Sequence, residues 1–161
     1  MTGWIRMVVL MASLGATSLV AAPALAKPLV DTVGDAGPFS VLVAAVKQAG
    51  LEDTLKGAGP FTLFAPSDDA FGKLPKDVYE SYFKPENKQK LRDLILHHVV
   101  AGTVRARDVA GKRLEAQPMA GEPLLIDATR TLMVDHGRIS QTDLKADNGI
   151  IHVVDTVLIP Q

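Results

Sequence analysis

The feature that most constrains the fold is a long run of β-forming residues at 149–159, near the end of the chain. Both alternating sets of its side chains are largely apolar, which is typical of an interior strand covered on both faces. Such a strand needs a partner elsewhere in the sequence. Residues 61–65, a short β-forming run bounded by Pro60 and Pro66, predict an early strand. We expect this strand to pair with residues 150–158.

Helical periodicity in the first half of the chain predicts several short helices. Apolar side chains recur every three or four residues over 39–49, and Gly50 follows where a left-handed cap is required. Ser40 is expected to cap the first turn of this helix. After the early strand, further helix starts are expected at Ser67, Pro75 and Pro85. The last of these helices is expected to end at Gly102.

The second half of the chain predicts a sheet. Short β-forming runs, separated by glycine and proline, cover 111–116, 123–127, 131–135 and 138–142. Between the last two, residues 135–137 are expected to form a tight hairpin turn in which Gly137 takes a positive φ. The fold class predicted from the whole pattern is α/β, of an α+β-like kind, with helices crowded into the first half and strands into the second.

The first 26 residues are typical of a secretory signal peptide. Arg6 is the only charged residue of this segment, and a short apolar run over 7–22 follows it. Ala24 and Ala26 supply the small residues of a cleavage site. We expect cleavage after Ala26 and a single secreted or periplasmic domain over 27–161, without a membrane span. An uncleaved membrane anchor is the alternative, disfavoured because the apolar run is short.

Composition excludes several classes of function. Seventeen basic and eighteen acidic residues give a net charge of −1, so no overall field attracts nucleic acid or anionic lipid. The chain has no cysteine, which excludes disulfides, thiolate metal sites and cysteine nucleophiles together. Only histidine and carboxylate chemistry remains for metals.

The residues best able to carry catalysis fit structural roles better. The histidines lack the spacing of a zinc site, and we expect them to be hydrogen-bonded structural residues. They are His97, His98, His136 and His152. The adjacent Asp68 and Asp69 fit a helix start better than an acid–base pair. Ser67 lacks the G-x-S-x-G context of a hydrolase nucleophile, and no phosphate-binding glycine loop is present. We predict no catalytic, cofactor or metal site.

Three segments resemble motifs of the fasciclin (FAS1, βig-h3) domain family. GPFTLFAPSDDAF at 59–71 is similar to the first motif, LILHHVVAG at 94–102 to the central Tyr-His motif, and NGIIHVVDTVLIP at 148–160 to the last motif. The three motifs occur in the same order as in the family. Together they span nearly the whole chain that follows the signal segment. One departure is His97, where the family usually has tyrosine, whereas His98 keeps the histidine of the motif.

The resemblance implies a wedge-shaped β-sheet core packed with short helices, in which the first and last motifs are neighbouring strands. Physical roles are then available for the motif residues. Asn148 and Gly149 allow the turn into the last strand. Ser67 caps a helix and Phe71 fills the core. His98 and His152 are expected to satisfy buried polar groups. The other motif positions expected to be structural are Phe61, Phe64 and Asp155.

The resemblance also implies an exported, non-catalytic module for adhesion, with an unidentified protein or a surface or matrix component as its partner. In animal relatives, cell binding has been attributed to the Tyr-His region and to an Asp-Ile pair before the last motif. The matching positions are His97, His98, Asp143 and Leu144. Core packing or turn formation is the alternative role for all four.

A second functional hypothesis is a carrier, in the periplasm or secreted, for a small apolar or polysaccharide ligand. Its pocket would be lined by aromatic and apolar side chains, which are equally good core residues. Those considered are Phe64, Tyr79, Tyr82 and Phe83.

Overall fold

The structure, a computed structural model, describes residues 27–160. The predicted signal peptide and its cleavage site after Ala26 lie outside the described residues. The elements follow in the order α1 (Leu29–Ala36), α2 (Ser40–Ala49), α3 (Glu52–Lys56), β1 (Phe61–Pro66), α4 (Asp68–Gly72), α5 (Lys76–Phe83), the 3₁₀ turn η1 (Pro85–Asn87), α6 (Lys88–His97), β2 (Val99–Ala101), α7 (Ala106–Val109), β3 (Arg113–Ala116), β4 (Leu124–Asp127), β5 (Met133–Val134), β6 (Gly137–Ala146) and β7 (Gly149–Val154). The predicted α/β class, with helices early and strands late, is confirmed.

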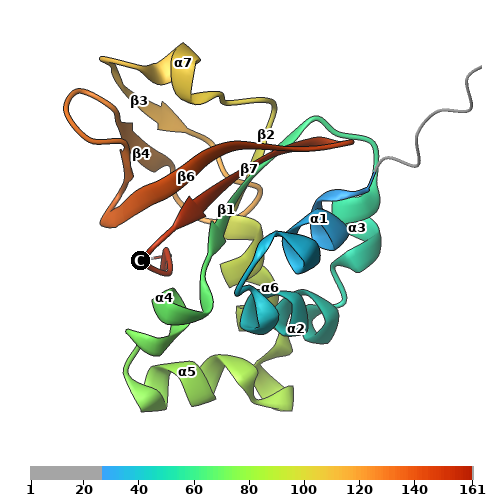
Figure 1. The fold of residues 1–161 in the computed structure, drawn as a ribbon. Helices are drawn as coiled ribbons and strands as arrows, with labels where there is room; N and C mark the ends of the chain where they lie inside the picture. Colours follow the sequence, from blue (N-terminus) through green and yellow to red (C-terminus); the bar gives the residue numbers. More distant parts are fainter. Residues whose placement is uncertain (1–26, 161) are drawn as a thin grey trace, which may run out of the picture.

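Strands β1 and β7 form the centre of the fold. They run parallel over six residue pairs, from Phe61 opposite Gly149 to Pro66 opposite Val154. This confirms the predicted pairing of the early strand with the C-terminal run. The seven-stranded sheet has the order β2-β1-β7-β6-β5-β4-β3, so β7 is an interior strand. In Figure 1 the strands β1, β7 and β6 lie between the helices α1, α2, α3 and α6 on one side and the strands β3 and β4 on the other.

The two faces of the β1–β7 pair cover two separate cores. Leu63 and Ile151 point into a larger core that α1, α2 and α6 complete. On the other face, Phe64 of β1 and Val154 of β7 point into a second core, formed with side chains of β3, β4 and β5. Because successive side chains of a strand point to opposite faces, both sets of residues must be apolar. This explains the continuous hydrophobic run.

The sheet curves until its two edges meet. Residues 117–119 continue from β3 toward β2, where Pro118 forms an isolated bridge with Val100. Next to it, the Met119 amide donates to the Val99 carbonyl at 2.8 Å. The outer edge of β2 is therefore partly covered, which protects it from pairing with another chain. No helix in the described part of the chain has the length and apolarity that crossing a membrane requires.

The C-terminal strand is shorter than the predicted run 149–159, and β6, with ten residues, is the longest strand. Residues after Val154 leave the sheet because their side chains pack into the two cores. Val157 packs into the larger core and Leu158 into the second one. Helix α6 also ends earlier than predicted, at His97 rather than Gly102. The reason is that residues 99–101 pair with β1 as β2.

Two expected local details are also wrong. Ser40 does not cap α2; instead the Asp68 carboxylate accepts hydrogen bonds from the amides of Ser40 and Val41, at 3.2 and 2.8 Å. In the hairpin turn before β6, the positive φ of 50° belongs to Asp135 and not to Gly137. Aspartate tolerates this conformation better than most residues. Its carboxylate also accepts from the Leu125 amide at 2.7 Å.

The turn into β7 depends on close backbone contact. A Cβ atom added to Gly149 would lie 2.0 Å from the carbonyl oxygen of Phe61 on β1. The Asn148 side chain ties the same turn to the helices: its Oδ1 accepts from the Leu29 amide at 3.0 Å, and its Nδ2 donates to the Leu55 carbonyl at 2.6 Å. Position 149 therefore requires glycine because no Cβ atom fits beside β1. This reason is separate from the turn that precedes β7.

We predict that Gly149→Ala destabilises the protein by about 3 kcal/mol, because a methyl group at this site must push β1 and β7 apart. The measurement is urea unfolding of residues 27–161. Gly72→Ala at the end of α4 is the matched control, since a Cβ there meets no atom within 4 Å. The control variant should unfold at or above the wild-type urea concentration. Equal stability of the two variants would contradict the close approach.

Candidate functional site

The four predicted interaction residues do not form one exposed group. His97 and His98 lie at the end of α6 and are both buried, with 3% and 1% of their surface exposed. Asp143 and Leu144 lie in β6 and are half-buried. A chain of contacts links His98 to Asp143: the His98 carbonyl accepts from the Phe64 amide, the Phe64 ring stacks on His152, and His152 Nδ1 accepts from the Asp143 amide.

His98 fastens the C-terminal segment to the end of α6. Its Nδ1–H donates to the Leu94 carbonyl at 2.7 Å, and its Nε2 accepts from the Leu158 amide at 2.9 Å. Because a carbonyl can only accept and an amide can only donate, these two bonds require a neutral ring in one tautomer. Burial lowers the pKa of His98 from its ordinary value to about 4.

His152 plays a similar role on β7. Its Nε2–H donates to the Val104 carbonyl at 2.6 Å, and its Nδ1 accepts from the Asp143 amide at 3.3 Å. The ring stacks on that of Phe64, with the centroids 5.6 Å apart. Burial lowers the pKa of His152 as well. Both buried histidines thus act as neutral connectors between segments far apart in the sequence.

Asp143 and Leu144 are engaged in structural contacts. Asp143 has a positive φ of 57°, at a point where the pairing of β6 with β7 shifts register. Its carboxylate accepts from the Ala106 amide at the start of α7, at 3.1 Å. Leu144 pairs with Ile151 and packs against the larger core. In this structure Asp143 therefore makes a turn and Leu144 a packing contact.

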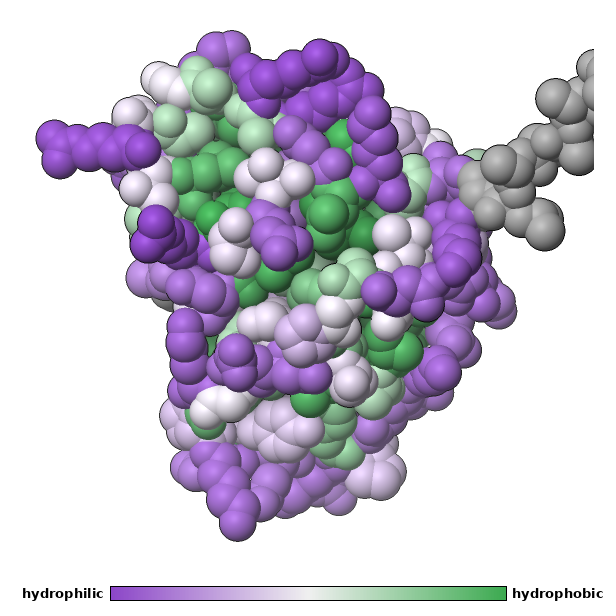
Figure 2. All heavy atoms as spheres, in the orientation of Figure 1, coloured by the Kyte–Doolittle hydropathy of each residue, from purple (hydrophilic) through white to green (hydrophobic). Residues whose placement is uncertain are grey.

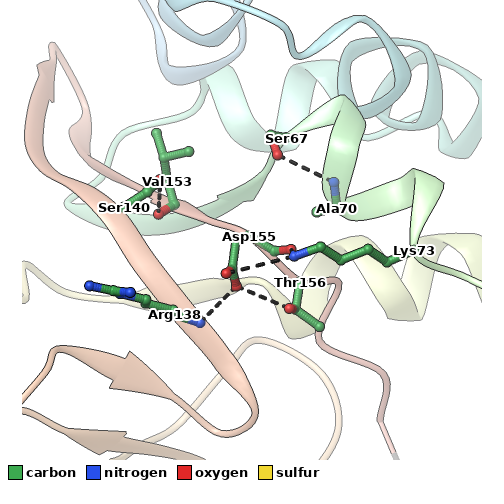
Figure 3. A network of polar contacts seen from close by, with 8 residues as sticks. All are labelled: Ser67, Ala70, Lys73, Arg138, Ser140, Val153, Asp155 and Thr156. Carbon is green, nitrogen blue, oxygen red and sulfur yellow. Dashed lines mark hydrogen bonds and ion pairs between the residues drawn. The ribbon is translucent and has the colours of Figure 1, made fainter.

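A polar network at the end of β7 joins the sheet to α4 (Figure 3). The Asp155 carboxylate accepts from the Arg138 amide at 2.9 Å and from the Thr156 hydroxyl at 3.0 Å. Lys73, just after α4, donates to the Asp155 carbonyl at 2.7 Å. Burial alone would raise the pKa of the Asp155 carboxyl, but these donors outweigh it and hold the pKa below its ordinary value. At the other end of α4, Ser67 Oγ accepts from the Ala70 amide at 3.3 Å.

The aromatic residues considered for a carrier pocket are engaged in packing. Phe64 is buried in the second core. Tyr79 and Phe83 stack on each other with centroids 4.6 Å apart, and both meet the Phe71 ring edge-on. Tyr82 packs beside them against the larger core. These rings support one another and the helices.

A surface hollow of about 530 Å³ lies beside His97. The residues around it come from the end of α6, the loop before β4, the turn before β6 and the C-terminal segment. They are His97, Glu122, Pro123, Asp135, His136, Val157, Leu158 and Ile159. Within residues 27–160, no three histidine or carboxylate side chains come together as ligands for one metal ion.

Sequence patterns did not single out Glu122 or Asp135 as members of a site. The two residues are 13 positions apart, in loops that the curved sheet brings to the same hollow. Only the hairpin turn that contains Asp135 was predicted. His97, which was predicted as an interaction residue through its motif, does reach this hollow.

Acid should weaken the fold through His98. The pKa of about 4 in the folded state lies below the ordinary 6.5, so the unfolded state takes up a proton first as the pH falls. The contribution of the neutral His98 ring to the free energy of unfolding is therefore complete above pH 6.5. It declines by about 3 kcal/mol as the pH falls to 4. Urea unfolding of wild type and His98→Gln across this pH range measures it. We expect the free energy of unfolding to fall less steeply in the variant, whereas parallel curves would contradict the role of His98.

Comparison with known proteins places the chain in a family. Residues 37–160 match the Fasciclin domain. Protein sll1483 from Synechocystis sp. is 40% identical over 123 residues, which cover 76% of this chain and 67% of that protein. The transforming growth factor-beta-induced protein ig-h3 of Sus scrofa is 36% identical over 125 residues, covering 76% of this chain but 18% of ig-h3.

A solved structure shows the same fold. The FAS1 domain pair of the insect cell adhesion molecule fasciclin I aligns with a TM-score of 0.70 at 18% sequence identity. The alignment covers 83% of this chain and 51% of the fasciclin I chain, so this chain spans about half of that structure. The β1–β7 pairing, the three motifs and these matches agree, and the chain belongs to the fasciclin domain family.

Proposed function

We propose that this protein is an exported, non-catalytic module for adhesion or protein interaction, acting in the periplasm or outside the cell after removal of residues 1–26. Fasciclin I, which has the same fold, is an insect cell adhesion molecule. The observation that carries the proposal is that the buried polar groups are used for structure, while a hollow beside His97 stays open on the surface.

The chemistry of the described residues favours binding over catalysis. Both ring nitrogens of His98 and of His152 are engaged in hydrogen bonds within the fold, so neither ring is available as an acid or base. The residues that line the hollow include no serine, threonine, tyrosine or lysine, and its ionisable groups are two carboxylates and two histidines.

The surface is compatible with a non-obligate interface. Figure 2 shows hydrophobic residues on the visible face, over both the sheet and the helices, between hydrophilic side chains. Such mixed polarity is typical of interfaces between proteins that also exist separately.

Adhesion can be tested with beads coated with residues 27–161. We expect such beads to be retained on cells of the producing strain several-fold above beads coated with albumin, because a folded recognition surface is presented. The matched control is the same protein unfolded by heat before coating, which should lose the retention. Retention equal to albumin, on whole cells and on isolated envelope material, would contradict the adhesion function.

A further inference from the structure

The hollow beside His97 has a chemistry that selects its ligand. We infer that it binds a basic side chain, a lysine or an arginine presented by a partner protein; this inference rests on the proposed interaction function and specifies its partner. Two carboxylates, Glu122 and Asp135, and two histidines, His97 and His136, line a space whose described lining residues include no lysine or arginine.

His97 supplies a fixed acceptor at the wall of the hollow. Its Nδ1–H donates to the Ala120 carbonyl at 3.1 Å, so the Nε2 atom of the neutral ring carries the free lone pair. Among the described residues, Nε2 has no hydrogen-bond partner. The residue as a whole is only 3% exposed. The hollow is where His97 reaches the surface.

The loop beside His97 holds the ring in place. Gly121 has a φ of 85°, and a Cβ there would lie 2.7 Å from His97 Nδ1. The backbone of this loop thus packs directly on the imidazole. A ring that is held both by this contact and by the Ala120 carbonyl is pre-organised for a ligand.

The two carboxylates are not neutralised within the described chain. The ion pairs of the described residues involve neither Glu122 nor Asp135. Asp135 is held by the bond that it accepts from the Leu125 amide at 2.7 Å, which engages Oδ1 and leaves Oδ2 for a ligand. Glu122 is exposed at the other side of the hollow. The negative charge of these carboxylates attracts a guanidinium or ammonium group and repels an anionic ligand.

The remaining wall suits the stem of a long basic side chain. Pro123, Val157, Leu158 and Ile159 contribute apolar surface, and Ile159 is 42% exposed. Lysine and arginine bury their methylene groups against such surface while the charged head stays polar. A neutral sugar fits less well, because the described lining has no phenylalanine, tyrosine or tryptophan to stack on a sugar ring.

The test is a titration of ¹⁵N-labelled residues 27–161 with N-acetyl-arginine amide, followed by amide chemical shifts. N-acetyl-citrulline amide is the matched neutral probe. We expect saturable shifts at residues 120–122, 134–137 and 157–159 for the arginine probe, and at least tenfold weaker binding of citrulline. Absence of saturable shifts, equal binding of the two probes, or shifts with methyl glucoside in place of arginine would overturn the inference.

Charge-neutral variants locate the binding. Glu122→Gln with Asp135→Asn should weaken the arginine probe at least fivefold, since asparagine keeps an oxygen for the Leu125 amide and tolerates a positive φ. Glu115→Gln on β3 removes the same charge from an exposed position outside the lining of the hollow and should leave binding unchanged. An equal loss in the Glu115 variant would show only a general charge effect and overturn the site.

The bead assay separates this inference from the proposed function. One outcome is that wild-type and double-variant beads adhere equally while the arginine titration is flat. In that case the hollow is not the binding site, and the adhesion function stands. If the arginine probe binds as expected but wild-type beads are not retained, the adhesion function fails and the site remains.

Discussion

The parallel pairing of β1 with β7 determines where the other parts of the fold lie. These strands come from the first and last motifs, and their six residue pairs join segments about ninety positions apart. Because both strands are apolar on both faces, they separate a helical core from a second core under the curved sheet. The contact at Gly149 allows the two backbones to approach, and Asn148 ties their starting points to α1 and α3.

Buried histidines complete this arrangement where apolar residues could not. His98 and His152 each provide one donor and one acceptor, and so satisfy backbone groups of segments that have left regular structure. The histidine of the central motif, His98, therefore has a structural role in its two backbone contacts. His97 differs from its neighbour, since its Nε2 has no hydrogen-bond partner among the described residues and its hollow is also lined by two carboxylates.

Much of the fold could be predicted from the sequence, because local patterns specify it. The strand at 61–66, its pairing with β7 and the helix starts after Ser67, Pro75 and Pro85 follow from periodicity, proline placement and capping. The capping of α2 by Asp68 and the early end of α6 depend on partners far along the chain, which local signals do not contain. The hollow was missed for the same reason, since Glu122 and Asp135 meet only after the sheet has curved.

Native-state hydrogen exchange tests the central claim most directly, that β1 and β7 are one cooperative unit on which both cores depend. The account predicts that the hydrogen-bonded amides of both strands exchange only through global unfolding, with one free energy equal to that from urea unfolding. Exchange of the β1 amides through a separate opening of much lower free energy, while β7 stays protected, would contradict it.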